Sequence, residues 1–97
     1  EALNGAAFAA IRQAKKPVVA MIRGYCIGGG LALALACDLR LADSTALFQL
    51  PPARLGLAYP LDGLRDLVAA IGSAAAKDLI FTARRIGAEE ALRLGLI

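Results

Sequence analysis

The chain is 97 residues long and 59% hydrophobic, and its 11 Lys and Arg against 8 Asp and Glu give a net charge of +3. The basic residues are scattered with almost no aromatic residues between them, a pattern that argues against nucleic-acid binding. Two cysteines without a CxxC pair and a lack of histidine argue against a disulfide framework and a typical zinc site, so we expect a reducing, cytoplasmic setting.

The first half of the chain alternates helix and strand signals. Apolar residues at helical spacing predict a helix over residues 2–14, which Pro17 ends. The apolar run 18–22 is typical of a short strand that is buried on both faces. Residues 24–30 are expected to form a turn and residues 31–36, small and apolar on every side, a deeply buried helix. This uncharged stretch is too short and too rich in glycine to span a bilayer, so no membrane contact is expected.

The second half completes an α/β order of elements. Residues 38–42 alternate charged and apolar side chains, as a strand does, and residues 46–49 predict a second short strand. Three helical segments follow, at residues 62–71, 74–82 and 88–94. Ser73 is a good N-cap for the second of them, and Gly95 ends the third. The high hydrophobic content predicts that neighbouring chain or a partner covers the apolar faces.

Three glycines, Gly28, Gly29 and Gly30, precede the buried helix. Without Cβ atoms the backbone can come close to a ligand, and the first N–H groups of a helix lack intrahelical partners and lie at its positive end. The turn can therefore hold a phosphate, a carboxylate or an oxyanion that develops during a reaction. The dinucleotide fingerprint and the phosphate loop are both absent. The alternative is a tight turn that lets the helix pack against the strand.

Several segments together, in order and spacing, resemble the crotonase (enoyl-CoA hydratase/isomerase) superfamily. The segments that carry the resemblance are residues 16–18, 28–30, 36–42, 46–48, 55–56 and 82–96. The resemblance covers nearly the whole chain and implies an α/β, crotonase-like spiral of ββα turns, with residues 1–97 as the central part of a single domain. It also implies an acyl-CoA substrate and assembly as a homotrimer or homohexamer.

By this resemblance, Gly29 matches the position whose N–H supplies half of an oxyanion hole, with Gly28 beside it in the substrate site. The other half comes from an upstream loop outside these residues. A thioester carbonyl becomes an enolate oxygen in the transition state, and such a donor is worth about 3–4 kcal/mol in other oxyanion holes. No metal or redox cofactor is implied, since coenzyme A arrives as part of the substrate.

The chain departs from the hydratases of this superfamily at two substrate-site positions. Hydratases use two glutamates to position and deprotonate a water, and the matching residues here are Ala32 and Pro52. Neither side chain can carry a proton. The resemblance therefore implies a lyase or isomerase that decarboxylates or isomerises its substrate through an enolate, rather than a hydratase. The alternative is a non-catalytic relative that keeps the fold for binding or assembly.

For the other candidate residues, a structural role is the alternative to a functional one. Tyr59, in a stretch that resembles the methylmalonyl-CoA decarboxylase-like branch, is expected to be catalytic, or else is a half-buried aromatic bonded to backbone. Arg54 faces either the acyl pocket or solvent. Asp62 is more plausibly a helix N-cap than a second acid/base. Cys26 has no histidine to activate it, so a nucleophilic role is improbable.

The second cysteine and the remaining charged candidates have structural explanations. Cys37 and Asp38 are expected to pack and cap at the end of the buried helix. Arg84 and Arg85 are expected to form a solvated turn, with contact to a coenzyme A phosphate as the lesser alternative.

Overall fold

The computed structural model describes the backbone of residues 2–50 and 61–97 and the side chains of residues 6–50 and 63–97. The elements run in the order α1 (Ala2–Arg12), β1 (Val19–Ile22), β2 (Tyr25–Ile27), α2 (Gly29–Ala36), β3 (Leu39–Ala42), β4 (Leu47–Gln49), α3 (Leu61–Ile71), α4 (Ser73–Thr82), β5 (Ile86–Gly87) and α5 (Ala88–Leu94). The α/β order expected from the sequence is confirmed.

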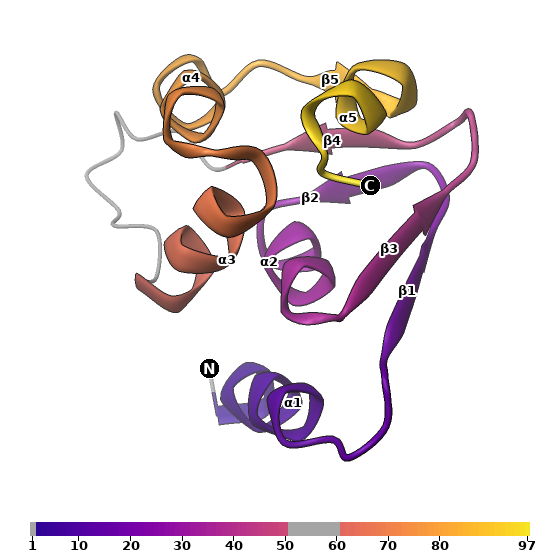
Figure 1. Cartoon of the computed structure of the whole chain (residues 1–97), viewed down its shortest axis with the longest axis vertical. Helices are drawn as coiled ribbons and strands as arrows, with labels where there is room; N and C mark the ends of the chain where they lie inside the picture. The colour runs from indigo at the N-terminus through magenta and orange to yellow at the C-terminus, as the bar shows by residue number, and fades with distance from the viewer. Residues whose placement is uncertain (1, 51–60) are drawn as a thin grey trace.

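The strands form two small sheets. β1 pairs in parallel with β3, with Val19 opposite Leu39, and β2 pairs in parallel with β4, with Tyr25 opposite Leu47. β5 adds to β4 in the antiparallel direction. The chain passes through both sheets twice, first as β1 and β2 and then as β3 and β4. The two passes bend side by side at the corner between the sheets (Figure 1). Each pass therefore contributes one strand to each sheet.

The corner between the sheets is held by Gly24 and the turn opposite it. Gly24 has φ of +62°, a left-handed conformation that favours glycine. Its N–H donates to Oγ1 of Thr45 over 3.1 Å, and its carbonyl accepts from the N–H of Leu47 over 2.8 Å. Asp43 accepts in turn from the N–H and the hydroxyl of Thr45. The ladder between the two passes stops at this bend, between the pair Ile22 and Ala42 and the pair Tyr25 and Leu47, and these hydrogen bonds hold the passes together there.

Two strands were not expected from the sequence. The segment 24–30 is not one turn, because residues 25–27 form β2 and only the glycines that flank it turn the chain. β5 has only two residues and is defined by its pairing with β4. The three residues of β2 lie between glycines that indicate a turn, and a strand of two residues such as β5 carries no periodicity.

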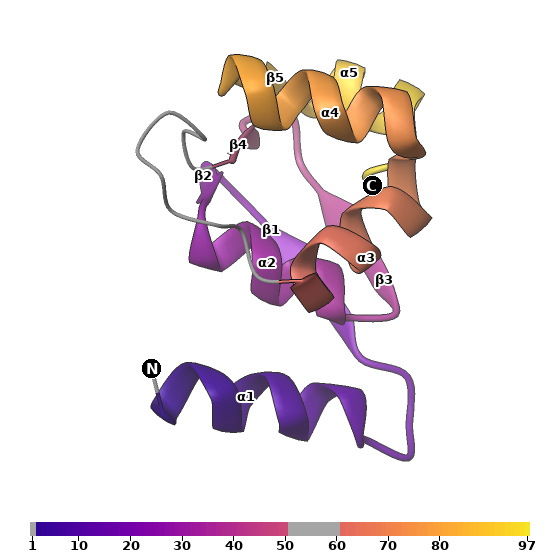
Figure 2. The same ribbon diagram turned by 90° about the vertical axis from the view of Figure 1, so that its left-hand side faces the viewer.

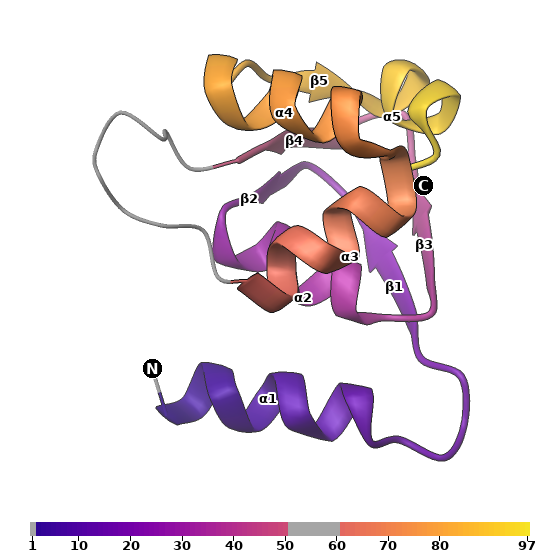
Figure 3. The same cartoon turned by 60° about the vertical axis from the view of Figure 1, so that its left-hand side comes forward.

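The helices cover one side of the strands. α2 lies between α1 and α3, with α1 running along its outer side (Figures 2 and 3). The deep burial expected of α2 is confirmed, since four of its eight residues are buried, namely Leu31, Ala32, Ala34 and Leu35. Phe48 and Leu50 extend this core toward β4 and are 1% exposed.

Two expected helix caps are wrong. Gly72, with φ of +87°, is the N-cap of α4, and Ser73 is the first helical residue, without a side-chain capping bond. α3 begins at Leu61, so Asp62 lies inside the helix and does not precede it. The end expected at Gly95 is confirmed, because Gly95 closes α5 in the left-handed conformation.

One face of the β1–β3 sheet is open in the described part of the chain. Met21 is 74% exposed and Leu39 is 58% exposed, and Val19 and Leu41 lie on the same face. The prediction that β1 is buried on both faces is therefore wrong for these residues. Arg40 instead points inward, where it binds main-chain carbonyls.

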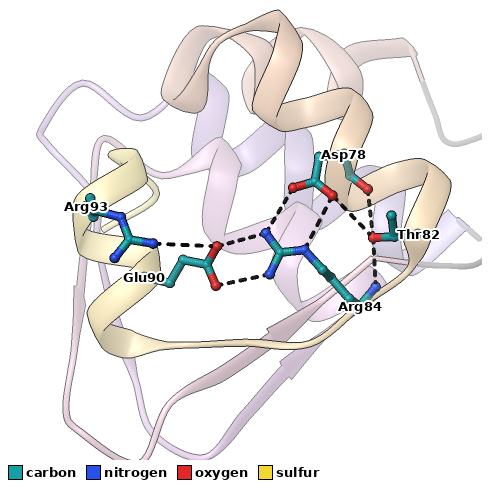
Figure 4. A network of polar contacts seen from close by, with 5 residues as sticks. All are labelled: Asp78, Thr82, Arg84, Glu90 and Arg93. Atoms are coloured by element: carbon teal, nitrogen blue, oxygen red, sulfur yellow. Dashed lines mark hydrogen bonds and ion pairs between the residues drawn. The ribbon is translucent and has the colours of Figure 1, made fainter.

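The connection from α4 to α5 is exposed at Arg84 and Arg85, as expected, and Arg84 also ties the two helices together (Figure 4). Its guanidinium group binds Asp78 at the end of α4 over 2.9 Å and Glu90 at the start of α5 over 2.8 Å. Arg93 approaches the same carboxylate of Glu90 over 3.8 Å. These hydrogen bonds hold the pKa values of Asp78 and Glu90 below their ordinary values.

Candidate functional site

The glycine turn joins the end of β2 to the start of α2. Gly28 has φ of +57° and ψ of −118°, a backbone conformation that side-chain-bearing residues rarely adopt. Its N–H donates to the carbonyl oxygen of Gln49 over 3.0 Å, and its own carbonyl accepts from the N–H of Ala32 over 3.0 Å. The turn is thus fixed to the neighbouring strand on one side and to the first turn of α2 on the other.

The open end of α2 is the candidate binding site. Gly29 is the first residue of the helix, it is exposed, and its N–H has no acceptor among the described residues. A Cβ atom built on Gly28, Gly29 or Gly30 would meet no atom of the described residues within 4 Å. The main chain is therefore open to a ligand, and the free N–H lies at the positive end of the helix dipole. Such a donor can stabilise an anion or a developing oxyanion.

An apolar cleft of about 390 Å³ borders the turn at Gly30. It runs between α1, β1 and α2, and Ile11, Ala20 and Leu33 line part of its walls. Its volume is in the range that small organic ligands occupy.

Both cysteines line this cleft, and their surroundings keep them as thiols. Burial raises the pKa of Cys26. Burial is also the main cause that raises the pKa of Cys37, partly offset by the charge of Arg40 and reinforced by that of Asp38. A raised pKa lowers the thiolate fraction at neutral pH, which agrees with the expectation that Cys26 is not a nucleophile.

Asp38 has a different role from the one expected. Its carboxylate accepts a hydrogen bond from the N–H of Val18 over 2.7 Å, so it caps the entry to β1 rather than the end of α2. At the helix end, Sγ of Cys37 donates to the carbonyl oxygen of Leu33 over 3.5 Å.

The structure brings together only some of the predicted site residues. Gly28, Gly29 and Ala32 share the first turn of α2, and Ala32 is 6% exposed. Three other predicted residues, Pro52, Arg54 and Tyr59, lie outside the described residues. Their roles stay predictions.

Sequence reasoning missed a polar cluster beside the turn. The side chain of Gln49 donates to the carbonyl oxygen of Ala83 and accepts from Arg85, whose guanidinium carbon lies 5.3 Å from the ring centroid of Tyr25. These partners are far apart in sequence, so no spacing in the chain could have indicated the contacts.

The described part of the chain holds neither a candidate metal site nor a helix able to span a membrane. No three histidine, cysteine, aspartate or glutamate side chains there gather in a group able to hold a metal ion. None of its helices has the length and apolarity needed to cross a membrane.

Comparison with known proteins matches residues 4–97 to the family model described as enoyl-CoA hydratase/isomerase. The short-chain-enoyl-CoA hydratase of Clostridium acetobutylicum is 41% identical over 95 residues, which are 98% of this chain and 36% of that protein. The peroxisomal delta(3,5)-delta(2,4)-dienoyl-CoA isomerase of Arabidopsis thaliana is 44% identical over 92 residues, 95% of this chain and 33% of that protein.

A solved structure gives the same result for the fold. It is that of a protein from Hyphomonas neptunium provisionally assigned to the enoyl-CoA hydratase/isomerase family, and it superimposes with a TM-score of 0.89 at 50% identity. The match covers 93% of this chain and 34% of that one. The crotonase-like fold expected from the resemblance is confirmed. The chain spans about a third of the length of the curated relatives it matches.

Proposed function

The chain belongs to the enoyl-CoA hydratase/isomerase family, and on that premise we propose that the protein acts on an acyl-CoA thioester through an enolate. The N–H of Gly29 donates a hydrogen bond to the thioester oxygen as negative charge develops on it. The observation that carries the proposal is the open first turn of α2, where this N–H is exposed and has no acceptor among the described residues. A second donor comes from a loop outside these residues.

The reaction is decarboxylation or double-bond isomerisation rather than hydration. The position that holds a glutamate in hydratases is Ala32, which is buried and has no group to bind a water or a proton. In a decarboxylation, the bond between the α-carbon and the carboxylate breaks and carbon dioxide leaves. The electron pair passes into the thioester, whose oxygen Gly29 stabilises, and the α-carbon then takes up a proton. The relatives include one named as a hydratase and one named as an isomerase, so the preference within the family rests on Ala32 and Pro52 and not on the relatives' names.

Three side chains outside the described residues complete the proposed site. Tyr59 is the proposed proton-handling or carboxylate-orienting group, by its resemblance to the decarboxylase-like branch. Pro52 takes the place of the second hydratase glutamate, and Arg54 lines the acyl pocket. The apolar cleft at Gly30 favours an apolar part of the substrate beside the turn.

The remaining properties follow the family resemblance. Coenzyme A is bound as part of the substrate, without a separate metal or redox cofactor. The protein assembles as a homotrimer or homohexamer and acts in the cytoplasm.

The proposal is tested on the full-length protein that contains this chain. The protein is incubated separately with crotonyl-CoA and with methylmalonyl-CoA, and product masses are followed by liquid chromatography and mass spectrometry. Loss of carbon dioxide from methylmalonyl-CoA without hydration of crotonyl-CoA supports the enolate reaction. A water adduct of crotonyl-CoA would contradict the argument from Ala32 and Pro52. Absence of either change, together with failure to bind an acyl-CoA, would favour a non-catalytic relative.

A further inference from the structure

Both the nitrogen and the oxygen of the Gln49 side-chain amide are hydrogen-bonded beside the glycine turn. Nε2 donates to the carbonyl oxygen of Ala83 over 2.6 Å, and Oε1 accepts from Nε of Arg85 over 3.0 Å. An amide nitrogen only donates and an amide oxygen only accepts, so these two partners fix one orientation of the group.

The two partners of Gln49 are themselves held. Ala83 closes α4 in the left-handed conformation, with φ of +51°, which leaves its carbonyl oxygen facing β4 rather than the helix. Arg85 lies over the ring of Tyr25, the first residue of β2. The side chain of Gln49 therefore connects β4 to the α4–β5 connection and, through Arg85, to β2.

The main chain of Gln49 holds the glycine turn. Its carbonyl oxygen accepts the N–H of Gly28, the residue directly before Gly29, and its Cα lies opposite Ile27 in the pairing of β2 with β4. A shift or rotation of Gln49 would change the direction of the Gly28 peptide and hence that of the next N–H. No other described residue outside α2 bonds the main chain of Gly28.

We propose that Gln49 is a positioning residue for the oxyanion donor. It acts through Gly28, setting the direction in which the N–H of Gly29 meets the thioester oxygen, and it does not touch the substrate. This role rests on the proposed function, because it needs an acyl-CoA whose oxygen Gly29 binds.

The test measures the hydrogen bond itself. The full-length protein binds butyryl-CoA labelled with ¹³C at the thioester carbonyl, and isotope-edited infrared spectroscopy records the carbonyl stretch. Butyryl-CoA has no double bond to hydrate and no carboxylate to lose, so the complex is stable. In the unaltered protein we expect a lower stretching frequency than in free butyryl-CoA.

Gln49→Met keeps the length of the side chain and removes both hydrogen bonds. We expect this variant to lose most of the frequency shift, with little change in the Kd for butyryl-CoA. Its kcat for the acyl-CoA substrate of the proposed reaction should fall about 10- to 100-fold, because small misplacements of reacting groups have effects of this size. Gln13→Met, at an exposed position after α1, is the matched control and keeps the full shift.

The outcomes separate this inference from the proposed function. A full shift in Gln49→Met would overturn the positioning role and leave the proposed function standing. No binding or no shift in the unaltered protein would overturn the proposed function and this role with it. If Gln49→Met does not fold, Gln49→Glu decides, because it keeps an acceptor for Arg85 and loses the donor to Ala83. A full shift in Gln49→Glu would then overturn the role.

Discussion

Arg40 donates from Nε to the main-chain carbonyl oxygen of Leu96 over 2.7 Å. This hydrogen bond joins the middle of β3 to the segment that follows α5. The same guanidinium group donates to the carbonyl oxygen of Cys37 over 3.0 Å. Leu96 is fully buried in the core. One cation therefore satisfies two main-chain acceptors and fixes the position of a core residue.

Replacing Arg40 with Met removes both bonds and leaves these carbonyl oxygens without their donor. We expect the free energy of unfolding of the full-length protein to fall by about 2 kcal/mol, the usual size for hydrogen bonds to a charged donor. Urea denaturation followed by circular dichroism measures this change. Arg23→Met is the control, because the Arg23 side chain is 87% exposed and should contribute almost nothing. Equal effects of the two variants would contradict the inward role of Arg40.

Gly95 is a second site where the structure predicts a specific cost. Its φ is +92°, and a Cβ atom there would lie 2.9 Å from the carbonyl oxygen of Ala70. Gly95→Ala should lower stability by about 1–3 kcal/mol, because it combines a strained backbone with a clash. At Gly87, φ is −88° and an added Cβ would meet no described atom within 4 Å, so Gly87→Ala should be nearly neutral. The melting temperatures of the two variants, measured side by side, check the contrast.

The Arg84 network predicts a pH dependence of stability. The pKa values of Asp78 and Glu90 are lowered in the folded protein, chiefly by hydrogen bonds from Arg84. Their stabilising effect is therefore complete above the ordinary carboxyl pKa values and is lost as the pH falls through the lowered ones. The melting temperature of Arg84→Met should be below that of the unaltered protein at pH 7, with the difference shrinking below about pH 4.

Arg93→Met is the control for this network. It removes the longer 3.8 Å contact to Glu90 from a largely exposed side chain, and it should have a smaller effect at every pH. A difference between Arg84→Met and the unaltered protein that stays constant down to pH 3 would show that the carboxylates do not carry the effect.

The proposed oxyanion donor can be removed without removing the helix. Gly29 is the first residue of α2, the helical position where proline is best tolerated, so Gly29→Pro deletes the N–H and little else. We expect kcat for the acyl-CoA substrate to fall about 10²- to 10³-fold, as for other oxyanion-hole donors, with the melting temperature nearly unchanged. Gly29→Ala keeps the N–H and its Cβ has room among the described residues, so it should retain much more activity. Equal activity in both variants would exclude the N–H as the donor.

The sequence predicted the longer elements well and the contacts between distant residues poorly. Helical periodicity located α1, although the helix ends at Arg12 rather than at residue 14, and Gly95 located the end of α5. β2 was missed because the glycines on both sides of it indicate a turn, and β5 because its two residues are a strand only through their pairing with β4. The side chains of Gln49 and Arg85 are 36 residues apart, and only the folded chain brings them together.

Alternation along a strand does not say which side faces inward. The pattern at residues 38–42 correctly predicted β3, yet Arg40 points into the molecule while Leu39 and Leu41 are exposed among the described residues. A sequence pattern alone favours the opposite choice, because burying leucine gains more than burying arginine. The carbonyl groups at Cys37 and Leu96 reverse that preference, and they are visible only in the folded chain.

The parallel pairing also indicates where in this fold the number of residues in a connection can change. Val19 pairs with Leu39, 20 residues later, whereas Tyr25 pairs with Leu47, 22 residues later. The second pass is thus two residues longer, and the surplus lies entirely between β3 and β4, at the corner opposite Gly24. Insertions and deletions should be accepted at this corner and rejected inside the strands, where one added residue would turn every following side chain to the other face.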